Sequence, residues 1–334
     1  MSELSTRERA SQQDLYSILN KVIPHVGVAL DFDDTLVCSE FVTAWVTKDL
    51  VNPFLEEANR PVLTVADICT NFSGLSFGKQ VELLQEQQGI VVPETVIKQK
   101  EQQNLKALSK YALPLPGSED FLKFLMDFGF NAAVLTASKG DRVDATIKCV
   151  QFEPYLTTKT AQDDGRIPVV SAGQSKMWRG KEIPSLAHKP APDGYQFVAQ
   201  ALGLKPSEMI AFEDSAPGVM AAVRAEYRHV AIVSLSRRCE MMPDHVDSLK
   251  EIIADSEKAI VVNQTWMPAA VAMLELGLKN AKAAGVRDLP EVLPPDMIDF
   301  VRERLNPSHP KDAAKNDGEV REWTGDRGLL TAHM

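Results

Sequence analysis

Residues 27–40 read GVALDFDDTLVCSE, and the change of character within this stretch decides the fold that we expect. An apolar run over residues 26–30 is followed at once by Asp31, Asp33 and Asp34. A buried strand tolerates charge only where the charge is paired or bound, so a strand that ends in carboxylates either leaves the core or reaches a site. The rest of the chain decides between these two possibilities.

The composition argues against several classes of function. The chain has 334 residues, of which 44% are hydrophobic, and its formal net charge of -10 disfavours binding to nucleic acid or to a membrane surface. No apolar stretch approaches the roughly 18–20 residues that span a bilayer, and the first residues lack the apolar region of a signal peptide. The four cysteines are scattered without metal-type spacing, which favours a reducing, cytoplasmic location. The oligomeric state stays open.

Short apolar segments alternate with amphipathic helical segments along much of the chain. We expect strands at 26–30, 131–138, 208–215 and 229–235, with helices between them and a mostly helical stretch over 40–111. This alternation predicts an α/β fold with a doubly wound parallel sheet that helices cover on both faces. In such sheets, sites form at the carboxyl ends of the strands.

Polar side chains stand at the ends of three expected strands and just before one helix. Because the carboxyl ends of neighbouring parallel strands meet at one edge of a sheet, these side chains should converge on one crevice. Acids, a hydroxyl and an ammonium group together suit phosphoryl transfer with Mg²⁺. They are Asp31 and Asp33 after the first strand, Thr136 and Ser138 after the second, Glu213 and Asp214 after the third, and Lys189 before the helix.

Four short motifs in a fixed order give the chain a resemblance to a known family. DFDDT occupies 31–35, LTAS occupies 135–138, Lys189 opens KPAPDGY, and FEDSAPGV occupies 212–219. In these motifs the chain resembles the haloacid dehalogenase-like (HAD) hydrolases, and within them the phosphatase and β-phosphoglucomutase branch with a helical cap. The resemblance covers roughly residues 25–255 and implies a Rossmann-like HAD core with an inserted α-helical cap domain.

The resemblance, with the composition around it, implies a division of the chain into five parts. We expect the cap between the first and second strands, where this branch carries it. A polar segment at 160–187 is expected to be an inserted loop. The predicted parts are an N-terminal extension (1–24), a HAD-like core (25–38 and 112–255), a helical cap (39–111), a C-terminal helical extension (256–306) and a disordered tail (307–334).

The resemblance also implies roles for the motif residues. Asp31 would be the nucleophile that forms an aspartyl-phosphate, and Asp33 would be the general acid and base. Thr136 and the backbone N–H of Ala137 would bind the phosphoryl oxygens, and Lys189 would neutralise their charge. Mg²⁺ would be the cofactor. Its implied ligands are Asp31, the backbone carbonyl of Asp33, Asp214, and Glu213 through a bound water.

Three further polar residues are candidate substrate contacts. Lys139 follows the second strand, and Asn71 and Lys79 belong to the expected cap. For each of them a solvated surface position is the commoner role. Asp34 takes a place where the commoner family motif has Gly. Because a turn tolerates Asp, we expect no function for it.

The leading prediction is a Mg²⁺-dependent phosphomonoester hydrolase that acts on a small phosphorylated metabolite such as a sugar phosphate. An alternative is a phosphosugar mutase of the β-phosphoglucomutase type, which uses the same core residues. Thr35 favours the phosphatase, because the mutases of this branch carry Val at that position. A third reading is a regulatory or binding protein that retains the fold without catalysis. The intact acids and lysine argue against it, because buried charge is costly to keep without a use.

Overall fold

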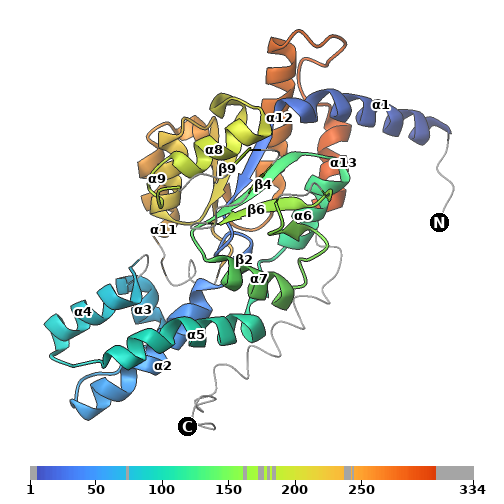
Figure 1. Cartoon of the computed structure of the whole chain (residues 1–334). Helices are drawn as coiled ribbons and strands as arrows, with labels where there is room; N and C mark the ends of the chain where they lie inside the picture. Colours follow the sequence, from blue (N-terminus) through green and yellow to red (C-terminus); the bar gives the residue numbers. More distant parts are fainter. Residues whose placement is uncertain are drawn as a thin grey trace.

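The structure is a computed structural model (Figure 1). It describes residues 6–72, 75–160, 164–171, 177–178, 181–182, 186–236, 242 and 244–305. The tail expected at 307–334 lies outside the described residues. None of the helices described has the length and apolarity needed to cross a lipid bilayer.

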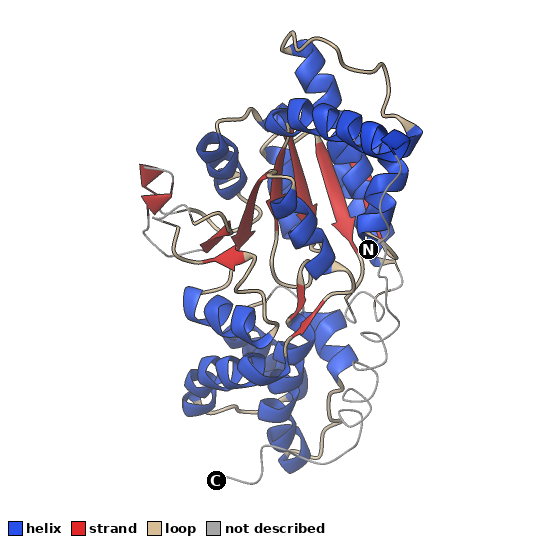
Figure 2. Ribbon diagram, turned by 90° about the vertical axis from the view of Figure 1, so that its right-hand side faces the viewer, coloured by secondary structure: helices blue, strands red, loops and turns tan. Residues whose placement is uncertain are grey.

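One seven-stranded sheet forms the centre of the molecule, in the order β11-β10-β9-β1-β4-β6-β5. Each neighbouring pair of strands is parallel, which confirms the predicted α/β fold with a parallel sheet. In Figure 2 the strands lie between layers of helices. The strands are β1 (Gly27–Leu30), β4 (Asn131–Thr136), β5 (Leu156–Thr157), β6 (Ile167–Ser171), β9 (Met209–Glu213), β10 (His229–Val233) and β11 (Ala259–Val262).

The register of the central strands brings the motif residues to one edge. Leu30 of β1 lies opposite Phe212 of β9 on one side and Val134 of β4 on the other. The next residue, Asp31, continues the ladder by donating its backbone N–H to the carbonyl of Phe212 at 2.9 Å. The three strands therefore end within two residues of one another, which brings their polar residues to the same edge.

Helices cover both faces of the sheet because alternate strand side chains point to opposite faces. In β1, Val28 and Leu30 join one buried cluster, whereas Ala29 joins the other. The first face is covered by α1 (Thr6–Val22), α6 (Ser118–Asp127), α7 (Gly140–Cys149), α12 (Met267–Ala283) and α13 (Pro295–Leu305). The second is covered by α8 (Asp193–Leu202), α9 (Ala216–Arg224) and α11 (His245–Ile253). Short 3₁₀ turns are η1 (Ile23–His25), η2 (Pro206–Glu208) and η3 (Ser256–Lys258).

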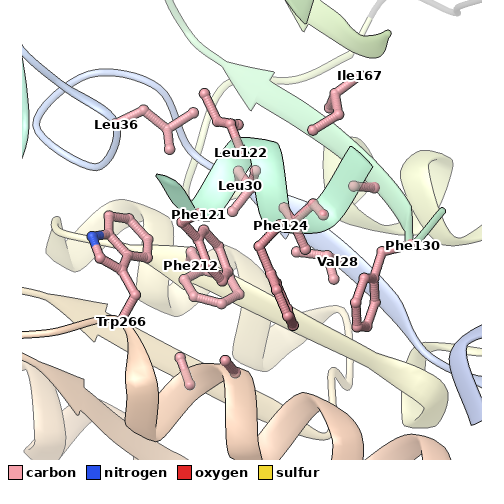
Figure 3. Packing of buried hydrophobic residues seen from close by; sticks show 14 of the residues in the cluster. Val28, Leu30, Leu36, Phe121, Leu122, Phe124, Phe130, Ile167, Phe212 and Trp266 are labelled. Atoms are coloured by element: carbon pink, nitrogen blue, oxygen red, sulfur yellow. The ribbon is translucent and has the colours of Figure 1, made fainter. Parts of the chain in front are cut away.

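An aromatic stack ties the C-terminal part of the chain to the first face (Figure 3). The ring of Phe121 in α6 lies 4.6 Å from that of Trp266 and 5.1 Å from that of Phe212, measured between centroids. Trp266 also donates its indole N–H to the carbonyl of Pro116 at 2.9 Å. These buried rings fix the segment that leads into α12 against the sheet.

Residues 40–111 form four helices, which we name the helical insertion. They are α2 (Glu40–Glu57), α3 (Val65–Phe72), α4 (Phe77–Gln88) and α5 (Glu94–Tyr111), and they confirm the predicted helical character of this stretch. The insertion has a buried cluster of its own, while the bases of α2 and α5 pack on the main core. It joins the core through the antiparallel pair β2 (Val37–Cys38) and β3 (Leu113–Pro114). The strands of the main sheet point towards it in Figure 2.

The expectation of a loop at 160–187 was wrong in part. Ile167–Ser171 is strand β6, which pairs with β4 inside the main sheet. Further on, the short strands β7 (Met177–Trp178) and β8 (Lys181–Glu182) form a two-stranded pair. Trp178 is buried, with its ring 6.0 Å from that of Phe197 in α8. Trp178 thus packs on the second face of the sheet.

Candidate active site

Asp31 and Lys189 form an ion pair at the end of β1. The ammonium of Lys189 lies 2.5 Å from Oδ1 of Asp31 and 2.6 Å from Oε1 of Glu213. It also donates to the backbone carbonyl of Leu135, at the end of β4, at 3.2 Å. One cation therefore connects the ends of β1, β4 and β9, and the lysine predicted to join the acids lies among them.

Asp33 is held by hydroxyl groups from two sides. Ser39 donates to its Oδ1 at 2.5 Å, from the position just before α2. Ser138 and Thr136 donate to its Oδ2 at 2.7 and 3.1 Å, from the end of β4. The Asp33 carboxylate therefore lies between the helical insertion and the end of β4.

Glu213 is fully buried and has several protein donors. Tyr195 donates its hydroxyl to Oε1, the same oxygen that faces Lys189. Ser215 donates to Oε2 at 3.3 Å. The carboxylate lies against the first turn of α9, where only a glycine fits, because a Cβ on Gly218 would come within 1.8 Å of Oε2. The glycine of the FEDSAPGV motif thus makes room for the acid of the same motif.

Asp214 completes a cluster of three buried carboxylates. Its Oδ1 accepts from the hydroxyl of Thr35 at 3.4 Å, and its backbone carbonyl accepts from Nε2 of His245 at 2.5 Å. Oxygens of Asp31, Glu213 and Asp214 all lie within 4.8 Å of one another. Three buried acids with one nearby ammonium leave negative charge uncompensated, and an all-oxygen donor set suits Mg²⁺. The donors present fit the predicted cofactor.

The pKa values reflect this crowding of acids. Burial raises the pKa of Asp31 to about 8; Lys189 opposes this shift, whereas Glu213 and Asp33 add to it. Burial disfavours the charge of Lys189, yet Asp31 and Glu213 outweigh it and raise the pKa of this ammonium above its ordinary value. Burial and Glu213 also raise the pKa of Tyr195, so its hydroxyl remains a donor. A divalent cation at the cluster would favour the ionised form of Asp31.

Ala137, predicted to bind phosphate through its backbone N–H, lies just beyond the end of β4. It follows Thr136 at the end of β4 and is exposed. Together with Thr136, Lys189 and His188 it lines a hollow of about 20 Å³. The backbone beyond β4 turns tightly here, because the N–H of Ser138 donates to the Thr136 hydroxyl at 2.9 Å.

The three candidate substrate contacts lie on the surface. Lys139 is exposed at the position before α7, and Asn71 is exposed on α3. Lys79 is exposed on α4, and its ammonium pairs with Glu82 of the same helix at 2.9 Å. Among the contacts of the described residues, none joins these three side chains to the acid cluster. Their part in substrate binding stays a prediction.

Among the residues that contact the site acids, Tyr195, Ser39 and His245 had no predicted part in the site. Tyr195 ends the KPAPDGY motif, so the motif itself was the available signal. Ser39 directly precedes α2, which begins at Glu40, and a serine in that position is typical of a helix start. His245 lies 31 residues beyond Asp214, and no local pattern joins the two.

Comparison with known proteins shows the family of the chain. A family model described as "Hydrolase: haloacid dehalogenase-like hydrolase" matches residues 26–226, more than half of the chain. The curated protein "Putative phosphatase YhcW" of Bacillus subtilis (strain 168) is 27% identical over 149 residues. That match covers 44% of this chain and 58% of YhcW, so the chain spans less than two thirds of this relative's length.

Solved structures show the same fold at low sequence identity. A conserved haloacid dehalogenase-like protein of Agrobacterium tumefaciens, ATU0790, superimposes with a TM-score of 0.56 at 20% identity, over 74% of this chain and 97% of that one. A HAD family hydrolase of Deinococcus radiodurans, with bound phosphate and sodium, gives a TM-score of 0.55 at 22% identity, over 76% and 97%.

Proposed function

The chain belongs to the haloacid dehalogenase-like hydrolase family, and we propose that it is a Mg²⁺-dependent phosphomonoesterase that forms an aspartyl-phosphate. One observation carries this proposal. The ammonium of Lys189 lies within 2.6 Å of a carboxylate oxygen of Asp31 and of Glu213, although the three residues come from segments far apart in the chain. Asp33 and Asp214 lie at the same edge of the sheet. A buried meeting of acids around one lysine is costly unless a ligand uses it.

Asp31 is the proposed nucleophile. Its carboxylate attacks the phosphorus, a bond forms from its oxygen to the phosphoryl group, and the bond to the leaving oxygen breaks. Lys189, already bonded to Asp31, keeps its charge beside the transferring phosphoryl group. Thr136 and the backbone at Ala137 orient the phosphoryl oxygens from the end of β4. Water then hydrolyses the aspartyl-phosphate and releases inorganic phosphate.

Asp33 is the proposed general acid and base. It gives a proton to the leaving oxygen in the first step and takes one from the attacking water in the second. Asp33 lies between Ser39 and the end of β4, which supports a role beside the proposed phosphoryl group, on the side of the helical insertion. Ser39, Thr136 and Ser138 orient the carboxylate, because each donates to one of its oxygens.

Asp31, Asp214 and Glu213 would hold the divalent cation, with the backbone carbonyl of Asp33 beside them. When bound, Mg²⁺ supplies positive charge that offsets the repulsion between the phosphoryl oxygens and the acids. Within the protein, Tyr195 and Ser215 fix the orientation of Glu213. His245 and Thr35 do the same for the segment at Asp214.

The helical insertion is the proposed cap. Its two connections are paired as β2 and β3, so it can move over the strand ends as one body and exclude water during the transfer. A cap of this kind favours a small phosphorylated substrate, such as a sugar phosphate. A folded protein substrate would fit less easily beneath it.

A phosphate-release assay tests the proposal. The purified full chain is incubated with a panel of phosphorylated metabolites and with para-nitrophenyl phosphate, with Mg²⁺ or with EDTA. We expect Mg²⁺-dependent release, lost by at least about 10³-fold in Asp31→Asn. Asp193→Asn is the matched control. It removes the same single negative charge, and the carboxylate of Asp193 is exposed at the start of α8.

Two other outcomes would point to the remaining alternatives. Interconversion of sugar-phosphate isomers without net phosphate release would identify a mutase. No turnover of any compound, with the folded chain still binding a phosphorylated ligand, would identify a binding protein. Either result contradicts the phosphomonoesterase.

A further inference from the structure

Asp34 occupies a strained position in the loop between β1 and β2. Its φ angle is 57°, in the left-handed region that glycine adopts without cost. The side chain is fully buried, and the backbone N–H donates to the carbonyl of Val37 at 2.7 Å. A buried carboxylate in a left-handed conformation is unfavourable on both counts. Its presence requires a compensating interaction.

That interaction joins Asp34 to the first turn of the helical insertion. Its Oδ1 accepts hydrogen bonds from the backbone N–H groups of Ser39, at 3.2 Å, and Glu40, at 3.1 Å. These amides lie at the start of α2, where the helix has no preceding turn whose carbonyls could accept from them. The carboxylate therefore caps α2 from outside the helix and also complements its dipole.

Ser39 does not cap the helix in this structure. It is the residue before α2 and the natural candidate for a cap, yet its side chain makes no capping bond. Its hydroxyl donates to Asp33 at 2.5 Å. Two consecutive acids thus divide the groups of Ser39: Asp33 takes the hydroxyl, and Asp34 takes the amide. The helix start and the proposed acid/base are fixed by adjacent residues.

We infer that Asp34 is a positioning residue, whose carboxylate fixes the start of α2 and thereby holds Ser39 against Asp33. The helical insertion has one other link to the core, through β3, so the direction of α2 decides how the insertion meets the strand ends. This inference rests on the proposed function for its effect on turnover, but not for its effect on the helix. The expectation that Asp34 carries no function is replaced by this role.

Two substitutions test the acceptor oxygen of Asp34. Asp34→Gly removes the acceptor and also relieves the strain at φ 57°. Asp34→Asn keeps an amide oxygen as acceptor and is also tolerated in the left-handed region. Both variants should fold, so a difference between them reports on the acceptor.

Amide hydrogen exchange tests the hydrogen bonds between Asp34 and the start of α2 without any assay of activity. We expect the amides of residues 39–43 to exchange at least about tenfold faster in Asp34→Gly than in the wild type, while Asp34→Asn stays close to the wild type. Exchange over residues 131–138, at the end of β4, should be equal in all three proteins. Unchanged exchange at 39–43 in Asp34→Gly would overturn the inference, whatever the activity.

Steady-state kinetics with para-nitrophenyl phosphate test the consequence for the site. We expect kcat to fall about tenfold in Asp34→Gly and to recover in Asp34→Asn. The inhibition constant for inorganic phosphate should not change, because Lys189 and Thr136 lie on other elements. Equal loss in both variants would overturn the positioning role. If no protein, wild type included, releases phosphate, the proposed function fails. Amide exchange alone then tests whether Asp34 fixes the start of α2.

Discussion

A side-chain carbon on Gly218 would lie 1.8 Å from Oε2 of Glu213. The acid at the end of β9 and the glycine in the first turn of α9 therefore occupy their positions only together. Glu213 is fully buried and accepts from Tyr195 and Ser215, so it has no free space into which it could move. This close packing makes the proposed metal site sensitive to one methyl group.

Gly218→Ala should destabilise the fold and weaken metal binding. We expect a loss of about 2 kcal/mol in the free energy of unfolding, because the added methyl must displace a buried carboxylate. Urea denaturation measures it, and a Mg²⁺ titration of activity should give a higher half-saturating concentration. Gly78→Ala is the control, because nothing lies within 4 Å of its added carbon. An unaltered stability in Gly218→Ala would contradict the packing described here.

Mg²⁺ should stabilise the wild type, because it offsets the repulsion among Asp31, Glu213 and Asp214. At a concentration one hundred times its Kd, we expect a gain of about 2.7 kcal/mol. Asp214→Asn should lose this gain. In EDTA the same variant should be at least as stable as the wild type, because one acid of the crowded cluster has been replaced by a neutral amide. Thermal unfolding of both proteins with and without Mg²⁺ measures the four values.

Ser39→Ala should slow the reaction without affecting the fold. The substitution removes one of three hydroxyl donors to Asp33, and the loss of one hydrogen bond of about 1 kcal/mol corresponds to roughly a fivefold fall in kcat. Ser109→Ala is a suitable control, because this hydroxyl bonds only the carbonyl of Lys106 in its own helix among the described contacts. Equal rates in the two variants would show that Ser39 does not orient Asp33.

Much of the site edge could be predicted from the sequence, because polar residues directly follow short apolar runs. Asp31, Thr136 and Glu213 each stand at the end of such a run, and parallel pairing brings the three ends together. The contacts of Ser39 and His245 could not be predicted in this way. They depend on the direction in which a helix starts and on the packing of α11, which no local pattern encodes.

The strand β6 was missed for a different reason. Its sequence, IPVVS, is short and contains Pro168, which lacks a backbone donor and argues against a strand inside a sheet. It nevertheless pairs with β4 on one side and with the two-residue strand β5 on the other. Buried packing of Val169 and Val170 on opposite faces outweighs the local signal.

Lys100, inside the helical insertion, should make stability depend on pH. Its ammonium is buried and donates to the carbonyl of Thr43 at 2.6 Å and to the hydroxyl of Thr47 at 2.7 Å. Burial lowers the pKa of Lys100 from its ordinary value of 10.5 to about 7; Glu40 and Glu101 oppose this shift, and Arg142 adds to it. Neutral amine is therefore favoured in the folded state above pH 7.

Between pH 7 and 10.5 the unfolded chain binds a proton at this lysine that the folded protein does not, so stability rises with pH across this window. We compare Lys100→Met with the wild type by urea denaturation at pH 7 and pH 9.5. Relative to the variant, the free energy of unfolding of the wild type should rise by roughly 3 kcal/mol from pH 7 to pH 9.5, since one pKa unit corresponds to about 1.4 kcal/mol. Lys98→Met, on the exposed face of the same helix, should show no such shift. If the difference in the free energy of unfolding between Lys100→Met and the wild type does not change with pH, the buried ammonium keeps its proton throughout, held by the two threonine oxygens.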